Sequence, residues 1–246
     1  MELFDPSSYL IISAGIFAGA VVSGFVGFAF SAVAGAFLLH LLPPTQAVPL
    51  MMACSIITQG VSLVALRGNV SWRGNPLLIA GGLIGVLPAL YLLHHVDTAV
   101  FRIGFGAFLV IYASYMLFRP VVTVASAVPG ALRHAMVGFG GGLVGGLTAM
   151  PGALPTIWCE LRGMSKDQQR GLVQPYIAAM QLFALAIMFS HSGSFSAQTL
   201  RDLASLLPAL AAGVALGLIM YRRVNDTMFR RIVLVVLACS GAVLAM

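Results

Sequence analysis

The sequence predicts an all-α polytopic membrane protein built from two homologous repeats of about four transmembrane helices each. Of its 246 residues, 60% are hydrophobic and only 8% are charged, whereas soluble domains carry about 25% charged residues. Apolar runs of roughly 17 to 25 residues, long enough to cross a bilayer as a helix, recur along the whole chain. A self-comparison of the chain indicates the repeat.

Eight apolar segments follow one another, separated by short polar connections. They lie at 9–39, 46–66, 75–93, 103–118, 132–159, 171–190, 203–221 and 227–245. The first and the fifth are too long for one plain span. Both also carry glycines in their middles, "GAVVSGFVGFAFSAVAG" at 19–35 and "GFGGGLVGGLTAMPG" at 138–152. We therefore expect these two segments to be counterparts with broken helices.

Shifting the chain on itself supports an internal repeat. At an offset of 128 residues, Arg102 falls on Arg230 within the similar stretches "HVDTAVFR" and "RVNDTMFR". At an offset of 122, Gln59 falls on Gln181. We predict a first transmembrane repeat at 1–120 and a second at 121–246.

The fifth segment holds Pro151, Gly152 and Pro155 within five residues. Proline lacks a backbone donor and clashes with the preceding turn, so a continuous helix here is not expected. Packing is one explanation, because small residues let transmembrane helices approach closely. Two breaks at corresponding places of two repeats favour a substrate site at the repeat interface instead. A half-helix that begins at such a break offers free N–H groups to an anion.

The orientation of the segments stays open at this stage. If each glycine-rich segment crosses the membrane once, the repeats are parallel, and Arg162, Lys166, Arg170 and other basic residues count as loop cations on the inside. If each forms a hairpin of two half-helices, the number of crossings changes and this count no longer decides the orientation.

Polar side chains follow each break within apolar surroundings. They are Ser55, Thr58 and Gln59 in the first repeat and Gln174, Tyr176 and Gln181 in the second. Polar groups in hydrocarbon are costly and face a partner or a cavity. Amide donors suit an oxyanion, and hydrogen bonding between helices is the competing explanation. No Asp, Arg or Lys is expected mid-span, which leaves Glu160 and His40 as the titratable groups nearest to the membrane for proton coupling.

Other function classes find little support in the sequence. The three cysteines lie far apart without metal-site spacing, so we expect no disulfide framework and no metal. The motifs of an intramembrane protease or a haem-binding electron carrier are not found, so an enzyme is not predicted. The net charge of +6 comes mostly from basic residues at segment ends, which favours lipid head groups and topology over nucleic acid. No cofactor is expected, and the oligomeric state is open.

Three stretches resemble the TauE/SafE sulfite exporter family, also called TSUP or DUF81. They are "GFVGFAFSAVAGAFLLHLLPPTQAVPL" at 24–50, "RGNVSWR" at 67–73 and "GLTAMPGALPTIWCELRGMSKDQQRGLVQPYIAAMQ" at 146–181. The resemblance covers nearly the whole chain and implies a multi-pass carrier of the bacterial inner membrane for small sulfur-containing anions. Phe28, Phe30 and Ser31 after Gly27 depart from the "GxGGG" of many first-repeat motifs, which points to a larger or less polar ligand.

The combined expectation is a transporter, and an exporter by the resemblance, that moves sulfite, thiosulfate or an organosulfonate by alternating access between the repeats. An anion-conducting pore and a carrier of a non-sulfur organic anion are the alternatives. The candidate substrate-binding residues are Gly27, Phe28, Ser31, Ser55, Gln59, Met150, Pro151, Gly152, Gln174 and Gln181.

Overall fold

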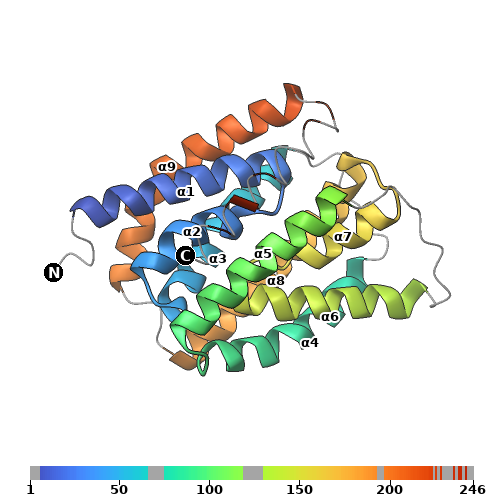
Figure 1. Cartoon of the computed structure of the whole chain (residues 1–246), viewed down its shortest axis with the longest axis horizontal. Helices are drawn as coiled ribbons and strands as arrows, with labels where there is room; N and C mark the ends of the chain where they lie inside the picture. Colours follow the sequence, from blue (N-terminus) through green and yellow to red (C-terminus); the bar gives the residue numbers. More distant parts are fainter. Residues whose placement is uncertain are drawn as a thin grey trace.

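The computed structural model describes residues 6–65, 75–118, 130–192 and 197–223, together with a few isolated positions beyond 223. These residues form nine α-helices and no strand (Figure 1). The helices are α1 Pro6–Val26, α2 Phe30–Leu41, α3 Pro44–Ala65, α4 Asn75–Leu93, α5 Thr98–Phe118, α6 Gly130–Thr148, α7 Ala153–Leu161, α8 Lys166–Ser192 and α9 Ala197–Arg223.

The two long glycine-rich segments are each divided into two helices. Segment 9–39 becomes α1 and α2, which are separated at residues 27–29. Segment 132–159 becomes α6 and α7, which are separated at residues 149–152. Five other predicted segments each coincide with one helix, α3, α4, α5, α8 or α9. The predicted segment 227–245 lies outside the continuously described residues.

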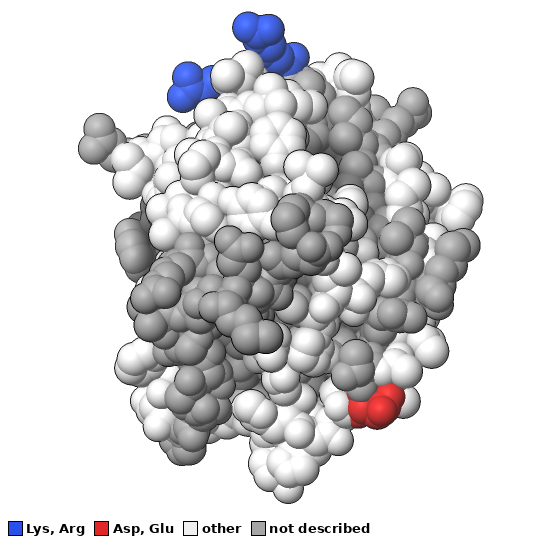
Figure 2. All heavy atoms as spheres, turned by 90° about the vertical axis from the view of Figure 1, so that its left-hand side faces the viewer, with Lys and Arg blue, Asp and Glu red and all other residues white. Residues whose placement is uncertain are grey.

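The surface of the described part suits a lipid environment. Five helices within it are long and apolar enough to cross a membrane: α1, α3, α4, α8 and α9. Large apolar side chains such as Leu10, Ile84 and Phe118 point outward with 62–80% of their surface exposed. In Figure 2 the drawn Lys and Arg side chains lie at the top of the view and the Asp or Glu at the bottom, with uncharged surface between them. The chain is therefore a multi-pass membrane protein.

The helices of the two chain halves interleave. α1 packs along α9, and α4 packs along α6, so each of these pairs takes one helix from each half (Figure 1). α3 and α8 also pack against each other. In Figure 1 the chain runs through α1 from left to right and through α6 from right to left, so these two helices have opposite directions.

Glycines let the helix backbones touch in both the α4–α6 pair and the α1–α9 pair. A Cβ atom at Gly142 of α6 would lie 2.0 Å from the carbonyl oxygen of Gly82 on α4, and one at Gly85 would lie 2.1 Å from that of Phe139. On the other pair, a Cβ at Gly217 of α9 would lie 2.2 Å from the carbonyl oxygen of Val21 on α1. Side chains at these positions would force the helices apart, because real Cβ atoms do not approach oxygen so closely. This is the small-residue packing used between membrane helices.

We expect Gly142→Ala to destabilise the protein, because its methyl group would meet backbone that has no room to move. Overpacking of this kind costs about 1–3 kcal/mol. The measurement is thermal unfolding in detergent. Gly60→Ala is the matched control, because Gly60 is an exposed helix residue with nothing within 4 Å of an added Cβ. Equal unfolding temperatures for the two variants would contradict the close α4–α6 contact.

Candidate functional site

The first helix break is centred on Gly27, whose φ angle is +97°. Only glycine adopts such an angle without strain. The Gly27 N–H donates to the carbonyl of Ser23 at 2.7 Å and so ends α1. Its own carbonyl accepts a hydrogen bond of 2.9 Å from the Nε2 of Gln59, a fully buried side chain on α3. The break is thus held by a side chain from the following helix.

The second break repeats this arrangement. Ala149 has a positive φ of 54°, and its N–H donates to Gly145 at 2.8 Å. Its carbonyl accepts from the Nε2 of Gln181 on α8 at 3.2 Å. Pro151 lies in the break itself, whereas Pro155 is the third residue of α7, where an N–H has no helical partner to lose. Both predicted breaks are therefore present, each with a glutamine on its carbonyl.

The two breaks touch each other in the protein core. The Ser31 hydroxyl, in the first turn of α2, donates to the Ala149 carbonyl at 2.6 Å. A Cβ at Gly152 would lie 2.9 Å from the Cβ of Phe28, so the backbone of the second break packs directly on the first. Met150 is fully buried beside them. The Ser31 side chain thus links the start of α2, next to the first break, to the second break.

Several of the predicted polar residues have other roles in the structure. Tyr176 donates from its hydroxyl to the Gly138 carbonyl at 2.6 Å and so ties α8 to α6. Thr58 donates to the Ser55 carbonyl at 2.8 Å. The Ser55 hydroxyl, however, is buried without a hydrogen-bond partner, as are the Oε1 atoms of Gln59 and Gln181. These buried polar atoms next to the breaks leave hydrogen-bonding capacity unused.

Arg170 is the residue that the sequence reasoning missed. It was counted among the loop cations, yet it lies in the second turn of α8 with only 4% of its surface exposed. Its Nη2 donates to the Gly24 carbonyl in the last turn of α1 at 3.0 Å, and its guanidinium carbon lies 4.1 Å from the centre of the Tyr221 ring. Arg170 is therefore a buried cation near the start of a candidate span rather than an exposed loop cation. The sequence feature that could have pointed to Arg170 was Gln174, a predicted site residue that lies one helical turn after it on α8.

Gln174 completes the surroundings of this guanidinium. With its carboxamide oxygen turned toward Arg170, it accepts from Nη2 at 3.1 Å and from Nε at 3.2 Å. A Cβ at Gly27 would lie 3.0 Å from Nε of Arg170 and 3.1 Å from the carboxamide of Gln174. The first break therefore carries a cation and an amide against its backbone.

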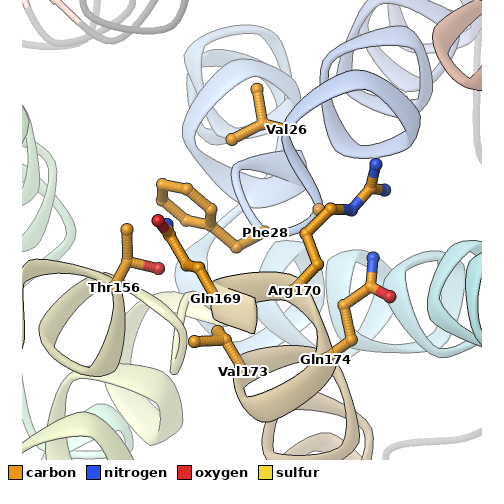
Figure 3. A pocket seen from close by; sticks show the side chains of 8 residues that line it. Val26, Phe28, Thr156, Gln169, Arg170, Val173 and Gln174 are labelled. Carbon is orange, nitrogen blue, oxygen red and sulfur yellow. The ribbon is translucent and has the colours of Figure 1, made fainter. Parts of the chain in front are cut away.

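A small pocket opens beside the first break (Figure 3). It is lined by Val26, Gly27, Phe28, Thr156, Gln169, Arg170, Val173 and Gln174. Figure 3 shows Thr156 and Phe28 on one side of this space and Arg170 and Gln174 on the other. Gly27, Phe28 and Gln174 are thus the predicted residues that line it. Of the other candidates, Met150, Pro151 and Gly152 form part of the second break, whereas Ser31, Gln59 and Gln181 donate to break carbonyls and Ser55 is buried in α3.

His40, one of the two titratable candidates, does not line this pocket. His40 is exposed at the end of α2, where its Nδ1 lies 2.9 Å from the Ala36 carbonyl. The side chain of Glu160 is outside the described part. Within the described residues, no group of three His, Cys, Asp or Glu side chains is arranged to hold a metal ion.

The amino-acid sequence matches a known protein family over nearly its whole length. The family described as "Sulfite exporter TauE/SafE" matches residues 11–244. The chain belongs to the TauE/SafE family. The resemblance seen in the three sequence stretches is thereby confirmed over nearly the whole length.

Membership of the TauE/SafE family assigns the chain to membrane transporters of the sulfite exporter type. Comparison with curated proteins yields no match, and comparison with solved structures yields none either. The helix breaks, the pocket and Arg170 are therefore interpreted from the chemistry of this chain.

We expect the substitutions Gly27→Ala and Ala149→Gly, one at each break, to have opposite effects on stability. Gly27→Ala should lower the stability by about 1–2 kcal/mol, because a side chain is strained at positive φ. Ala149→Gly should relieve strain and leave stability unchanged or raise it by up to about 1 kcal/mol. Thermal unfolding of both variants in detergent measures this. A loss of stability in Ala149→Gly larger than that in Gly27→Ala would contradict the assignment of strain.

Proposed function

We propose that this protein carries small sulfur-containing anions, such as sulfite, thiosulfate or organosulfonates, across the bacterial inner membrane by alternating access, and that it works as an exporter. Family membership supports the transport of a sulfite-type anion. The observation that carries the proposal is the contact between the two breaks, in which Ser31 of one donates to Ala149 of the other. Irregular backbone inside a membrane protein is tolerated where it is buried or lines a cavity, and substrate sites form there.

The proposed binding site comprises the ten residues predicted from the sequence. α2 begins after Ala29 without a side-chain cap, so its first N–H groups face the break at the positive end of the helix dipole. Gln59 and Gln181 each have two amide hydrogens, of which one is used on a break carbonyl. The second hydrogen is available to an oxyanion. Backbone and amide donors hold an anion without a charge of their own, which suits a carrier that must also release it.

The helix pairing suggests which parts move. α3 and α8 begin 122 residues apart, as do α4 and α9, and α1 and α6 end 122 residues apart. This regular offset supports the proposed two-repeat organisation, and the opposite directions of α1 and α6 favour an inverted relation between the repeats. Because glycine contacts fix α1 to α9 and α4 to α6, we assign these two pairs as the rigid bodies. Access would alternate as they rock about the breaks between them.

Counterflow in vesicles separates this proposal from a pore. In proteoliposomes preloaded with unlabelled sulfite, we expect uptake of labelled sulfite to saturate and to be faster than in empty vesicles, because a carrier must return through its occupied site. Thiosulfate, sulfoacetate, taurine and acetate serve as competitors. Flux that does not saturate and ignores internal sulfite would show a pore, and stronger competition by acetate than by any sulfur compound would favour a carrier of carboxylates.

The double variant Gln59→Ala/Gln181→Ala tests the two amides. We expect sulfite transport to fall by at least about tenfold, because each substitution removes a buried hydrogen bond worth about 1–3 kcal/mol when left unsatisfied. The matched control is Gln46→Ala/Gln168→Ala, which removes two exposed glutamines that are also 122 residues apart. If both double variants transport sulfite at the wild-type rate, Gln59 and Gln181 have no part in transport.

A further inference from the structure

Arg170 is a buried cation that forms no ion pair with a described carboxylate. Its hydrogen bonds go to the neutral groups of Gly24 and Gln174, while the Asp167 carboxylate acts on its charge from farther away. Asp167, one turn earlier on α8, instead accepts a hydrogen bond from the Tyr221 hydroxyl. The Tyr221 ring provides a cation–π contact, which lowers the cost of burial without neutralising the charge.

The guanidinium also has unused donors. Nη2 and Nε are occupied, whereas Nη1 is enclosed and has no hydrogen-bond partner. On the opposite side of the same pocket, the Thr156 hydroxyl is 1% exposed and likewise without a partner. Burying a charge or a hydroxyl without partners is unfavourable. Two such groups that line one pocket indicate that a ligand completes their hydrogen bonds.

We propose that Arg170 and Thr156 form an anion subsite beside the first break, with Arg170 supplying the positive charge for the transported oxyanion. This inference rests on the proposed function. It adds Arg170, which is not among the ten predicted binding residues, as the residue that balances the negative charge of the substrate. The two hydrogens of Nη1 and the hydroxyl hydrogen of Thr156 are donors for the oxygens of sulfite or a sulfonate group.

The rest of the pocket favours a small or partly apolar anion. Val26, Phe28 and Val173 contribute apolar side chains to its wall. A sulfonate would place its oxygens toward Arg170 and Thr156 and its carbon chain toward these residues. Because Arg170 lies at the first break, a movement of α1 relative to α8 would change its hydrogen bond to Gly24. Such a change provides a way to release the anion.

Direct binding of sulfite to Arg170→Gln and Thr156→Val tests the subsite. Sodium sulfite is titrated by calorimetry into purified full-length protein in detergent at constant ionic strength. We expect the Kd to rise on the order of 10- to 100-fold in Arg170→Gln and about threefold or more in Thr156→Val. Arg170→Lys should fall between wild type and Arg170→Gln, because it keeps the charge but loses the fork of donors.

Controls separate ligand binding from a structural role of Arg170. Arg222→Gln removes one exposed positive charge from α9 and should leave the Kd unchanged. Glutamine at position 170 keeps an amide donor for Gly24, so the fold can persist. If Arg170→Gln does not fold, Thr156→Val decides the question, since the Thr156 hydroxyl has no hydrogen-bond partner in the protein to lose. A lower unfolding temperature with an unchanged Kd would show a purely structural arginine and overturn the proposal.

The same titrations distinguish failure of the subsite from failure of the proposed function. Wild-type binding and transport of sulfite with an unchanged Kd in both variants would overturn the subsite alone. No binding of sulfite, but binding of acetate or thiosulfate that weakens in both variants, would support the subsite and overturn sulfite as the substrate. No binding of any of these anions to the wild type would overturn both.

Discussion

The structure depends on satisfying two backbone carbonyls where helices end inside the protein. The Gly27 and Ala149 carbonyls have no helical partner, and each receives an amide from a glutamine 32 residues later in the chain. In a membrane an unsatisfied carbonyl costs several kcal/mol, so each glutamine must reach its break. This requirement brings α3 against the first break and α8 against the second. The contact between α3 and α8 then places the two breaks side by side.

The outer helices are held by a different interaction. Glycines at the α4–α6 and α1–α9 contacts leave no space between the backbones, so sliding within a pair would create clashes at several positions together. The centre, in contrast, has short helices, hydrogen bonds from side chains and polar atoms without partners. The two tightly packed helix pairs surround a polar centre that is packed less closely. This arrangement suits a rocking movement of the pairs, in which the backbone at the breaks absorbs the change of angle between them.

Local sequence signals were sufficient for the helices and for the breaks. Apolar runs predict spans in any context, and Pro151 beside Gly152 interrupts a helix whatever it packs against. Gln59 and Gln181 were recognised because an amide stands out in apolar surroundings. The partners of these amides could not be predicted, because the contact of Ser31 with Ala149 joins residues 118 apart. The same holds for the pairing of α4 with α6, which depends on how the whole chain packs.

Arg170 shows the limit of composition-based reasoning and the asymmetry of the site. It follows Arg162 and Lys166 closely in the sequence, so its sequence surroundings are those of an interfacial cation. At the 122-residue offset that relates Gln59 to Gln181, Arg170 falls on Val48 and Gln174 falls on Met52, both apolar and buried. The second break therefore has the glutamine but neither the cation nor its amide neighbour. The two breaks are therefore similar in backbone and glutamine, but the first also has a buried cation against it.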